Sequence, residues 1–318
     1  MRVIVIGGGA AGFFGAIACA QAYPQAQVTI LEAAPHPLGK VRISGGGRCN
    51  VTHHCFDPKV LIQHYPRGGK ALLGPFSRFQ PHDTVAWFNQ RGVRLKTEAD
   101  GRMFPVTDDS ATIVNCLRQA AQQAQIQLRL KSPVRDLQLS GQQADHWQVL
   151  LKTGEILGGD RILLATGSSP LGYRWAKQAG HQIIPPVPSL FTFKISDPRL
   201  VDLAGISVES VRLHIGRGKQ KLQQTGPLLV THWGISGPAV LKLSAWGARL
   251  LHEQQYHLSL RINWQPELNL ETAQAALWQT KQQHPKRQVV NPVLNTLPGQ
   301  LPKRLWQRLV AAAQIPTQ

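Results

Sequence analysis

The chain opens with MRVIVIGGGAAG (residues 1–12), in which a short apolar run leads directly into a glycine-rich turn. An alanine-rich stretch from Phe13 to Ala22 predicts a helix, and Val28–Leu31 predicts a second strand that ends at Glu32. This succession of strand, GxGxxG turn, helix, strand and acid is the dinucleotide-binding fingerprint in its expected context. We therefore expect an α/β protein with a Rossmann-like domain at its start.

Each part of this fingerprint has a physical role. Gly7 permits the tight turn, Gly9 lets the backbone approach a pyrophosphate, and Gly12 lets the helix pack close to the strand. The N-terminus of the helix that follows Gly9–Gly12 offers free N–H groups to phosphates, and Glu32 can accept hydrogen bonds from ribose hydroxyls. The fingerprint does not separate FAD from NAD, but the acid disfavours a 2′-phosphate and therefore NADP in this site. The alternative is a glycine-rich turn without a ligand.

Length and composition limit the class of protein. With 318 residues, 42% of them hydrophobic, the chain can form two domains with a sizeable core. It contains no run of about 18 apolar residues, so we expect no transmembrane helix and no membrane partner. The first residues have the pattern of a buried strand, so we expect no secretion signal. Four cysteines without a CxxC pair fit a reducing cytoplasm.

The charge is strongly basic. The sequence holds 35 Lys and Arg against 17 Asp and Glu, a formal net charge of +18. Such a field favours polyanions, and RNA is the first candidate. Charge alone carries no specificity, so two alternatives stay open: a general compositional bias, or an acidic segment that would balance the chain.

Hydrophobic patterning indicates the organisation of the rest of the chain. Residues 33–55 are expected to form a long glycine-rich loop, and Asp108-Asp109-Ser110 is expected to cap a helix that runs to about Ala124. Val93–Lys96 and Met103–Val106 predict a hairpin. Alternating apolar residues predict a small antiparallel meander in Ile126–Leu130, Val134–Leu139, Trp147–Leu151 and Ile156–Leu157.

Beyond the meander, the sequence pattern predicts one more buried strand and then a different mixture of strands and helices. Residues 161–167 (RILLATG) predict a buried strand that ends in a glycine turn. After the proline-rich residues 185–188, residues 190–262 are expected to be rich in strands and residues 270–318 to be helical.

The loop GKVRISGGGRCNVT (residues 39–52) is a second informative stretch. Its three consecutive glycines let the backbone come close to a flat or charged ligand. Lys40, Arg42 and Arg48 can neutralise phosphates or a developing anion, and Ser44 and Asn50 supply neutral hydrogen bonds. A flexible surface loop is the alternative, but its length and position after the nucleotide fold favour a function.

Two segments, RISGGGRCNVT (residues 42–52) and THWGISGPAVL (residues 231–241), resemble the hallmarks of one bacterial flavoprotein family. This is the family of BaiN-like (YhiN-type) NAD(P)/FAD-dependent oxidoreductases, and the similarity extends to LPKR at residues 301–304. The resemblance implies a two-dinucleotide-binding, Rossmann-like FAD domain over 1–188, including the meander. It further implies inserted subdomains over 189–318, one β-rich (190–262) and one helical (270–318).

The resemblance also implies FAD as cofactor and NAD(P)H as electron donor, with the flavin passing hydride to an acceptor. The expected FAD-binding residues are Gly7, Gly9, Ala10, Ala11, Gly12, Glu32, Ala33, Gly39, Lys40, Arg42, Ser44, Gly45, Gly46, Arg48, Cys49, Asn50, Val134, Ala165, Thr166 and Gly167.

The sequence departs from the family pattern toward its end. Family members normally return to the FAD domain through a strand, a Gly-Asp or Gly-Glu pair and a glycine-rich helix start. After residue 250 this chain has one glycine, Gly299, and no aspartate. We therefore expect that closing segment to be absent from these residues.

Two residues in the second loop are candidates for catalysis. Cys49 beside Arg48 can be a thiolate or acid near the flavin, because a neighbouring arginine lowers a thiol pKa, or it can be a small packing residue. Arg48 or Lys40 is expected to stabilise negative charge on the reduced ring. His232 can be a proton donor or simply a turn residue. No metal site is expected, since the histidines lack a complete ligand set.

Basic and aromatic residues near the end form either an RNA-binding face or a solvated helix face: Trp278, Lys281, Lys286, Arg287, Lys303, Arg304, Trp306 and Arg308. What is known of similar proteins points to three reactions: reduction of a dehydro bile acid, oxidation of aminoacetone, or reduction of a ribosomal RNA uridine to dihydrouridine. The charge favours the RNA reaction. A non-catalytic nucleotide- or RNA-binding protein is the alternative.

Overall fold

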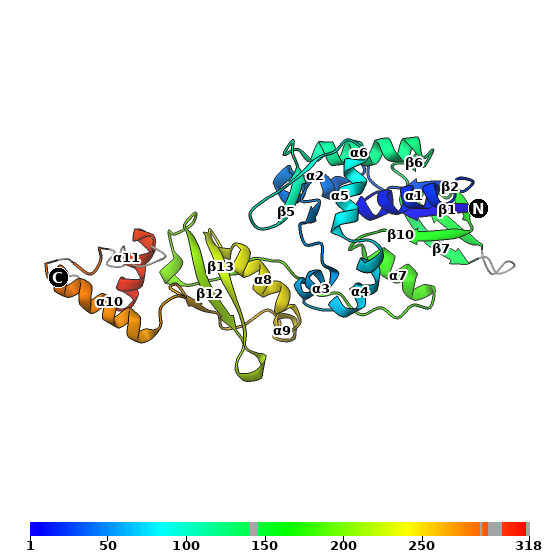
Figure 1. Cartoon of the computed structure of the whole chain (residues 1–318). Helices are drawn as coiled ribbons and strands as arrows, with labels where there is room; N and C mark the ends of the chain where they lie inside the picture. The colour runs from blue at the N-terminus through cyan, green and yellow to red at the C-terminus, as the bar shows by residue number, and fades with distance from the viewer. Residues whose placement is uncertain (140–145, 287, 292–300, 316–318) are drawn as a thin grey trace. The chain divides into compact units, whose positions relative to one another are not determined.

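The computed structural model describes residues 1–139, 146–286, 288–291 and 301–315. The chain divides into two compact units, Met1–Ile184 and Pro185–Gln318 (Figure 1). Among the described residues, no helix combines the length and the apolar character that crossing a bilayer requires.

The first unit is built on a four-stranded parallel sheet in the order β10-β1-β2-β6. Its strands are β1 (Arg2–Ile6), β2 (Gln27–Leu31), β6 (Gln127–Arg129) and β10 (Arg161–Leu164). Helices α1 (Ala10–Ala22) and α6 (Ser110–Gln123) lie together on one face of this sheet (Figure 1). The predicted Rossmann-like α/β fold is therefore confirmed.

Alternate side chains of β1 enter different cores, because successive residues of a strand point to opposite faces. Val3 and Val5 pack with residues of α1 and α6, such as Phe13. Ile4 and Ile6 pack with a three-stranded antiparallel meander on the other face. This meander consists of β7 (Val134–Leu139), β8 (Trp147–Leu151) and β9 (Ile156–Gly159).

One part of the meander prediction was wrong. Residues 126–130 contribute β6, which pairs in parallel with β2 and not with the meander. The strand follows α6, and a strand reached through a crossover helix joins its sheet in parallel. Alternation along the sequence indicates a strand but not its partner.

The predicted loop over residues 33–55 contains regular structure. It holds α2 (Gly39–Ile43), the 3-10 turn η1 (Ser44–Gly47) and β3 (Thr52–His53). β3 joins β5 (Arg102–Pro105) and β4 (Leu95–Thr97) in a small antiparallel sheet, which includes the predicted hairpin. Further helices of this unit are α3 (Pro58–Leu61), η2 (Ile62–His64), α4 (Gly69–Arg78), α5 (Pro81–Asn89) and α7 (Pro170–Gln178).

The second unit contains a five-stranded antiparallel sheet in the order β11-β14-β13-β12-β15. Its strands are β11 (Phe193–Lys194), β12 (Ser207–Ile215), β13 (Leu222–Thr231), β14 (Gly234–Ser236) and β15 (Arg261–Asn263). Its helices are η3 (Pro198–Leu200), η4 (Gly218–Gln220), α8 (Pro238–Trp246), α9 (Ala248–Glu253), α10 (Leu270–Gln283) and α11 (Lys303–Ala312).

The core of the second unit lies between one face of this sheet and α8. Val211 and Leu213 of β12 and Leu228 of β13 are buried there against Val240 and Leu243 of α8. The sequence did not predict α8 or α9 within the strand-rich region, because a short apolar run does not distinguish a buried helix from a buried strand.

Candidate functional site

The first unit contains a cavity of about 1150 Å³. It opens where β1 and β10 end and where α1 begins, with Gly7, Ala10 and Ala165 among its lining residues. In open α/β sheets, ligands bind at this carboxyl end of the strands. Small-molecule pockets typically measure about 300–1,000 Å³, so this cavity suits a ligand of dinucleotide size.

Most of the predicted FAD-binding residues line this cavity. They are Gly7, Gly9, Ala10, Ala11, Glu32, Ala33, Gly39, Lys40, Ser44, Cys49, Asn50, Val134, Ala165, Thr166 and Gly167. These residues come from separate elements: the β1–α1 turn, the end of β2, the segment around α2, the start of β7 and the end of β10.

The glycines of the β1–α1 turn meet different surroundings. Gly7 has φ +113°, and a Cβ there would collide with the carbonyl oxygen of Ala165. A Cβ on Gly12 would collide with the carbonyl oxygen of Gly7, so this glycine permits the close approach of α1 to β1 without lining the cavity. A Cβ on Gly9 would meet nothing within 4 Å. The space beside Gly9 is part of the cavity.

The N-terminus of α1 faces the same cavity. Gly9 is the N-cap residue, and no described side chain caps this end of the helix. Gly9, Ala10 and Ala11 all line the cavity. The first N–H groups of a helix have no partner within the helix and carry a partial positive charge, so this end can bind a phosphate group.

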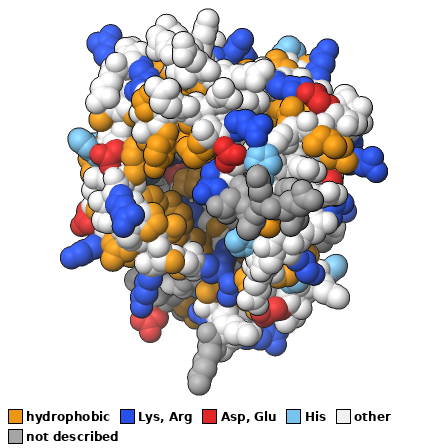
Figure 2. Space-filling view, turned by 90° about the vertical axis from the view of Figure 1, so that its right-hand side faces the viewer, with side chains coloured by type: hydrophobic (Ala, Val, Ile, Leu, Met, Phe, Trp, Pro, Cys, Tyr) orange, Lys and Arg blue, Asp and Glu red, His pale blue; other side chains and the backbone are white. Residues whose placement is uncertain are grey.

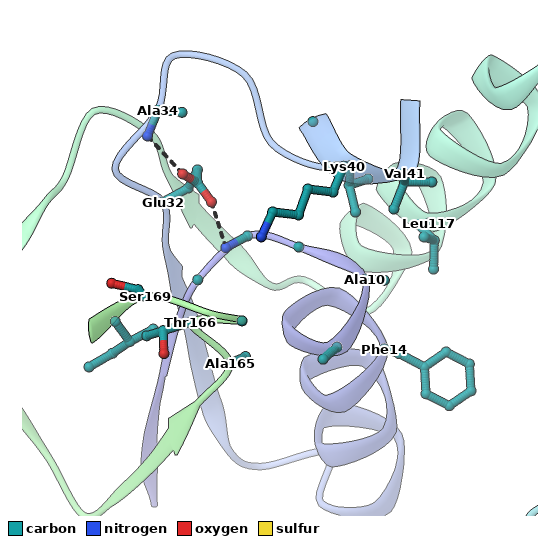
Figure 3. Close-up of a pocket in the computed structure, with 18 of the residues that line it drawn as sticks. Ala10, Phe14, Glu32, Ala34, Lys40, Val41, Leu117, Ala165, Thr166 and Ser169 are labelled. Atoms are coloured by element: carbon teal, nitrogen blue, oxygen red, sulfur yellow. Dashed lines mark hydrogen bonds between the residues drawn. The ribbon is translucent and has the colours of Figure 1, made fainter. Parts of the chain in front are cut away.

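Glu32 fixes the shape of the turn. Its Oε2 accepts a hydrogen bond from the backbone N–H of Gly8 at 2.7 Å, and its Oε1 accepts one from the backbone N–H of Ala34 at 2.7 Å (Figure 3). A carboxylate has about four lone-pair sites, so Glu32 keeps capacity to accept hydroxyl donors in the cavity that it lines.

Two lysines, Lys40 and Lys152, supply positive charge among the described lining residues. Lys40 Nζ lies 3.4 Å from Ser168 Oγ, so its side chain extends from α2 toward the turn after β10. In Figure 3 this side chain points toward the turn between β1 and α1. Lys40 can therefore stabilise negative charge beside that turn.

Part of the cavity wall is apolar and was not predicted from the sequence. It includes Phe14, Val41, Phe79, Phe88 and Leu117. The ring of Phe14 contacts that of Phe79 edge-on, with centroids 5.4 Å apart. Val41, Phe88 and Leu117 are buried residues of helices, and Phe79 follows α4. Nothing in the sequence shows that these elements present them to a common space. Such a wall suits a flat aromatic ligand.

Arg48 does not line the cavity. Its Nη1 lies 2.5 Å from Glu98 Oε1 and 3.5 Å from Asp108 Oδ1, and its guanidinium stacks over Phe104 at 4.0 Å from the ring centroid. The hydrogen bond with Glu98 raises the pKa of Arg48. The expectation that Arg48 faces the ligand does not fit this geometry, because two carboxylates compensate its charge on the β4–β5 side.

Cys49 lines the cavity but is only 5% exposed. Burial raises the pKa of the Cys49 thiol, and a hydrogen bond with Ser44 opposes this effect. This direction favours the neutral thiol, and therefore the packing role over the thiolate role. The lowering effect expected from Arg48 is absent because that guanidinium is turned toward Glu98.

Three other predicted residues also lie outside the cavity wall. Gly45 has φ +56°, and a Cβ there would come within 2.8 Å of the Asn50 backbone nitrogen, so this glycine shapes the loop. Gly46 also has a positive φ, +70°. The backbone carbonyl of Arg42 accepts a hydrogen bond from Ser110 Oγ at 2.8 Å, which anchors α2 to the start of α6.

The candidates of the second unit are dispersed. His232 and Trp233 lie in the turn between β13 and β14, and Trp233 is 60% exposed. Arg308 pairs with the carboxylate of Asp202 at 3.0 Å, and Trp306 Nε1 donates to the carbonyl of Val289 at 2.7 Å. The predicted Arg287 lies outside the described residues. Within the described part of the chain, no group of three or more His, Cys, Asp or Glu is placed to hold a metal ion.

Comparison with known proteins gives a consistent result. The chain is 32% identical over 325 aligned residues to a ribosomal RNA dihydrouridine synthase of Escherichia coli, covering 98% of this chain and 74% of that protein. It is 28% identical to a 3-dehydro-bile acid delta(4,6)-reductase of Clostridium scindens, covering 99% and 76%.

A solved 3-ketosteroid-delta4-(5alpha)-dehydrogenase from Rhodococcus jostii shows 15% identity and a TM-score of 0.45, covering 65% of this chain and 59% of that one. The model of the HI0933-like protein Rossmann domain matches residues 1–295. The chain therefore belongs to this HI0933-like family, and its predicted membership of the BaiN-like FAD-dependent oxidoreductases is confirmed.

Proposed function

We propose that this chain binds FAD in the cavity of the first unit and uses NAD(P)H to reduce an activated carbon–carbon double bond. The observation that carries this proposal is the cavity itself, which combines an uncapped helix N-terminus, the Glu32 carboxylate and an aromatic wall. These three features match the pyrophosphate, ribose and ring system of a flavin dinucleotide in their chemistry.

The residues present fit this cofactor. The backbone N–H groups at Ala10 and Ala11 would bind the pyrophosphate, and Glu32 would accept hydrogen bonds from the ribose. Gly9 leaves the space that a phosphate needs near the backbone. Val134 lies at the start of β7 and would present its backbone to the adenine.

Bound FAD would accept a hydride from a nicotinamide and deliver it to an electron-poor double bond. Lys40 lines this part of the wall and would compensate the pyrophosphate's negative charge beside the β1–α1 turn, and its positive charge would also favour the anionic, reduced ring. The phenylalanines and Leu117 would exclude water from the reacting centre. The chain thus provides orientation and a dry environment.

For the substrate, we propose a uridine of ribosomal RNA. In the balanced reaction, NAD(P)H supplies a hydride and water supplies a proton, and the C5–C6 double bond becomes saturated to give dihydrouridine and NAD(P)⁺. The net charge of +18 supports an anionic substrate. On the face drawn in Figure 2, Lys and Arg side chains are widely distributed and Asp and Glu are sparse.

A small-molecule substrate is the second candidate. The similarity to the Clostridium scindens protein supports it, because that protein is named as a delta(4,6)-reductase of 3-dehydro-bile acids. The two candidates differ in what stimulates NAD(P)H consumption. A dehydro-steroid acts without nucleic acid, whereas the uridine reaction requires RNA.

Incubation of the FAD-loaded chain with NADPH or NADH and unmodified ribosomal RNA tests the proposal. Nucleoside mass spectrometry should detect a uridine that has gained two hydrogen atoms, and only when both nicotinamide and protein are present. Stoichiometric NAD(P)H oxidation with a dehydro-steroid and none with RNA would contradict the RNA substrate but retain the reductase.

A further inference from the structure

The face of the second unit's sheet that points away from α8 carries a row of basic side chains. In β12, Val211, Leu213 and Ile215 are buried toward α8. Since side chains alternate along a strand, Arg212 and His214 lie on the opposite face. β12 and β13 form a hairpin (Figure 1), and Arg217 in the segment that connects them is exposed.

Strand register brings further positive charge to the same face. His214 is paired with Arg261 on β15, and Arg212 is paired with Asn263. Lys221, which precedes β13, is exposed. We call Arg212, His214, Arg217, Lys221 and Arg261 the basic strip.

The basic strip lacks compensating acids. None of its four Lys and Arg residues forms a salt bridge with a described residue, although Arg212 donates a hydrogen bond to the carbonyl of Pro266 at 3.1 Å. Residues 210–252 contain six Lys or Arg and no Asp or Glu, while Glu209 precedes this stretch in β12. Arg212 and Arg261 are diagonal neighbours on β12 and β15, so their like charges repel, and a bound anion would offset this repulsion.

The neighbours of the basic strip are polar. Gln223 is paired with His214, Thr225 with Arg212, and Asn263 lies on the other side of Arg212. Amide and hydroxyl groups can bind phosphate and sugar oxygens. Stable docking of a protein on a membrane surface combines cations with an apolar face, which these neighbours do not supply. The composition therefore favours a nucleic acid over a lipid surface.

We propose that the basic strip binds the phosphate backbone of an RNA strand. The RNA class rests on the proposed function, whereas the polyanion-binding character rests on the strip alone. Contacts of lysine and arginine with phosphates position a nucleic acid without reading its sequence. The strip would thus provide affinity, and the choice of uridine would belong to the cavity of the first unit.

The C-terminal helices are a less suitable surface for RNA. Arg304 and Arg308 of α11 both contact Asp202, and Trp306 is engaged with Val289. On α10, Lys281 lies 5.2 Å from the ring of Trp278 and is exposed. Lys281 and the exposed Lys286 therefore provide matched control positions in the same unit.

The test compares the double variant Arg217→Gln/Lys221→Gln with the control Lys281→Gln/Lys286→Gln. Both remove two positive charges from exposed positions. Fluorescence anisotropy with a labelled single-stranded RNA gives Kd over a range of salt concentrations. We expect the strip variant to weaken binding roughly tenfold and to lower the slope of log Kd against log salt by about two. The control should resemble the parent.

Several outcomes overturn the proposal: equal RNA affinity in the parent and strip variant, an equal loss in the control, or binding of the strip to phosphatidylserine vesicles in preference to RNA. FAD content and circular dichroism of each variant confirm folding. The proposed function is measured separately. RNA binding that depends on the strip, without uridine reduction, would support the strip proposal and reject the proposed reductase function. Uridine reduction with RNA binding that does not depend on the strip would reject the strip proposal alone.

Discussion

Glu32 Oε2 accepts a hydrogen bond of 2.7 Å from the backbone N–H of Gly8, which joins the end of β2 to the turn after β1. The carboxylate therefore has two roles in this account: it holds the turn, and it is available to the ligand. The same side chain therefore holds the turn in place and would bind the ribose.

Substitution Glu32→Ala removes both roles. Loss of hydrogen bonds to a charged group costs about 1.5–3 kcal/mol, so we expect FAD affinity to fall by roughly one to two orders of magnitude. Fluorescence titration of the apoprotein with FAD measures this change. The control is Glu155→Ala, which removes an acid that pairs with Arg129 at 2.5 Å and does not line the cavity. Equal affinities in the two variants would contradict the role of Glu32.

Substitution of two glycines of the fingerprint by alanine should affect different properties: FAD affinity for Gly9 and stability for Gly12. Gly9→Ala places a methyl group in open space, so we expect stability to change by about 0.5 kcal/mol or less while FAD affinity falls. Gly12→Ala creates a collision with the Gly7 carbonyl, so we expect destabilisation by about 1–3 kcal/mol or more. Denaturant unfolding and FAD titration of both variants separate the effects. A destabilised Gly9→Ala with normal FAD binding would reverse the assignment.

Substitution of Lys40 and substitution of Arg48 should differ in their effect on FAD binding and on the flavin potential. Lys40→Met removes a cation from the cavity wall, so it should weaken FAD binding and make the bound flavin harder to reduce. Arg48→Met removes a partner of Glu98 outside the cavity and should leave the flavin potential unchanged. Spectroscopic redox titration of the two variants checks this. A larger shift in Arg48→Met than in Lys40→Met would show that the guanidinium acts on the flavin.

Cys49 should behave as a packing residue. Because burial raises the pKa of its thiol, Cys49 should react with iodoacetamide more slowly than the less buried Cys55 at neutral pH. In Cys49→Ala, the rate at which NAD(P)H reduces bound FAD should stay within about threefold of the parent rate, since the substitution removes no thiolate. Mass spectrometry of labelled peptides and stopped-flow reduction measure the two quantities. Rapid alkylation at Cys49 would restore the thiolate interpretation.

The second unit should lose stability on acidification. Burial lowers the pKa of His214, and Lys221, Arg212 and Arg261 add to this effect. The unfolded chain therefore takes up a proton near the ordinary pKa of 6.5 before the folded chain does. The stability that His214 contributes is present above that value and is lost as pH falls toward the folded pKa. His214→Gln should flatten this pH dependence in denaturant titrations, and an unchanged dependence would exclude His214 as its source.

RNA binding should raise the pKa of His214, since phosphates would counter the three cations around it. NMR titration of the ring, with and without a single-stranded RNA, measures this shift. No shift on saturation with RNA would place the strand elsewhere on the protein.

The N-terminal part of the fold could be predicted because its signals are local. Residues 1–32 contain the strand, the turn glycines, the helix and the acid within one short stretch, and the structure reproduces each of them. The helix begins at Ala10, three residues before the predicted start. Glycine has low helix propensity, so the sequence pattern underestimates a helix that starts on a glycine turn.

The parts that could not be predicted depend on distant contacts. α2 is a five-residue helix that is held against α6 by the hydrogen bond from Ser110 Oγ to the Arg42 carbonyl. A helix this short is not stable by itself, so the sequence pattern does not indicate it. Arg48 meets Glu98 and Asp108 from 50 and 60 residues away. The sequence shows the charge of Arg48 but not the acids that turn it away from the cavity.

The most direct test of the central claim is an absorbance spectrum of the purified chain with added FAD, before and after anaerobic NADH or NADPH. We expect about one bound flavin per chain, bleaching of its absorbance with the nicotinamide, and loss of binding in Gly9→Ala while the fold is retained. A folded chain that takes up no FAD, or that binds it equally well after Gly9→Ala and Glu32→Ala, would contradict the assignment of the cavity.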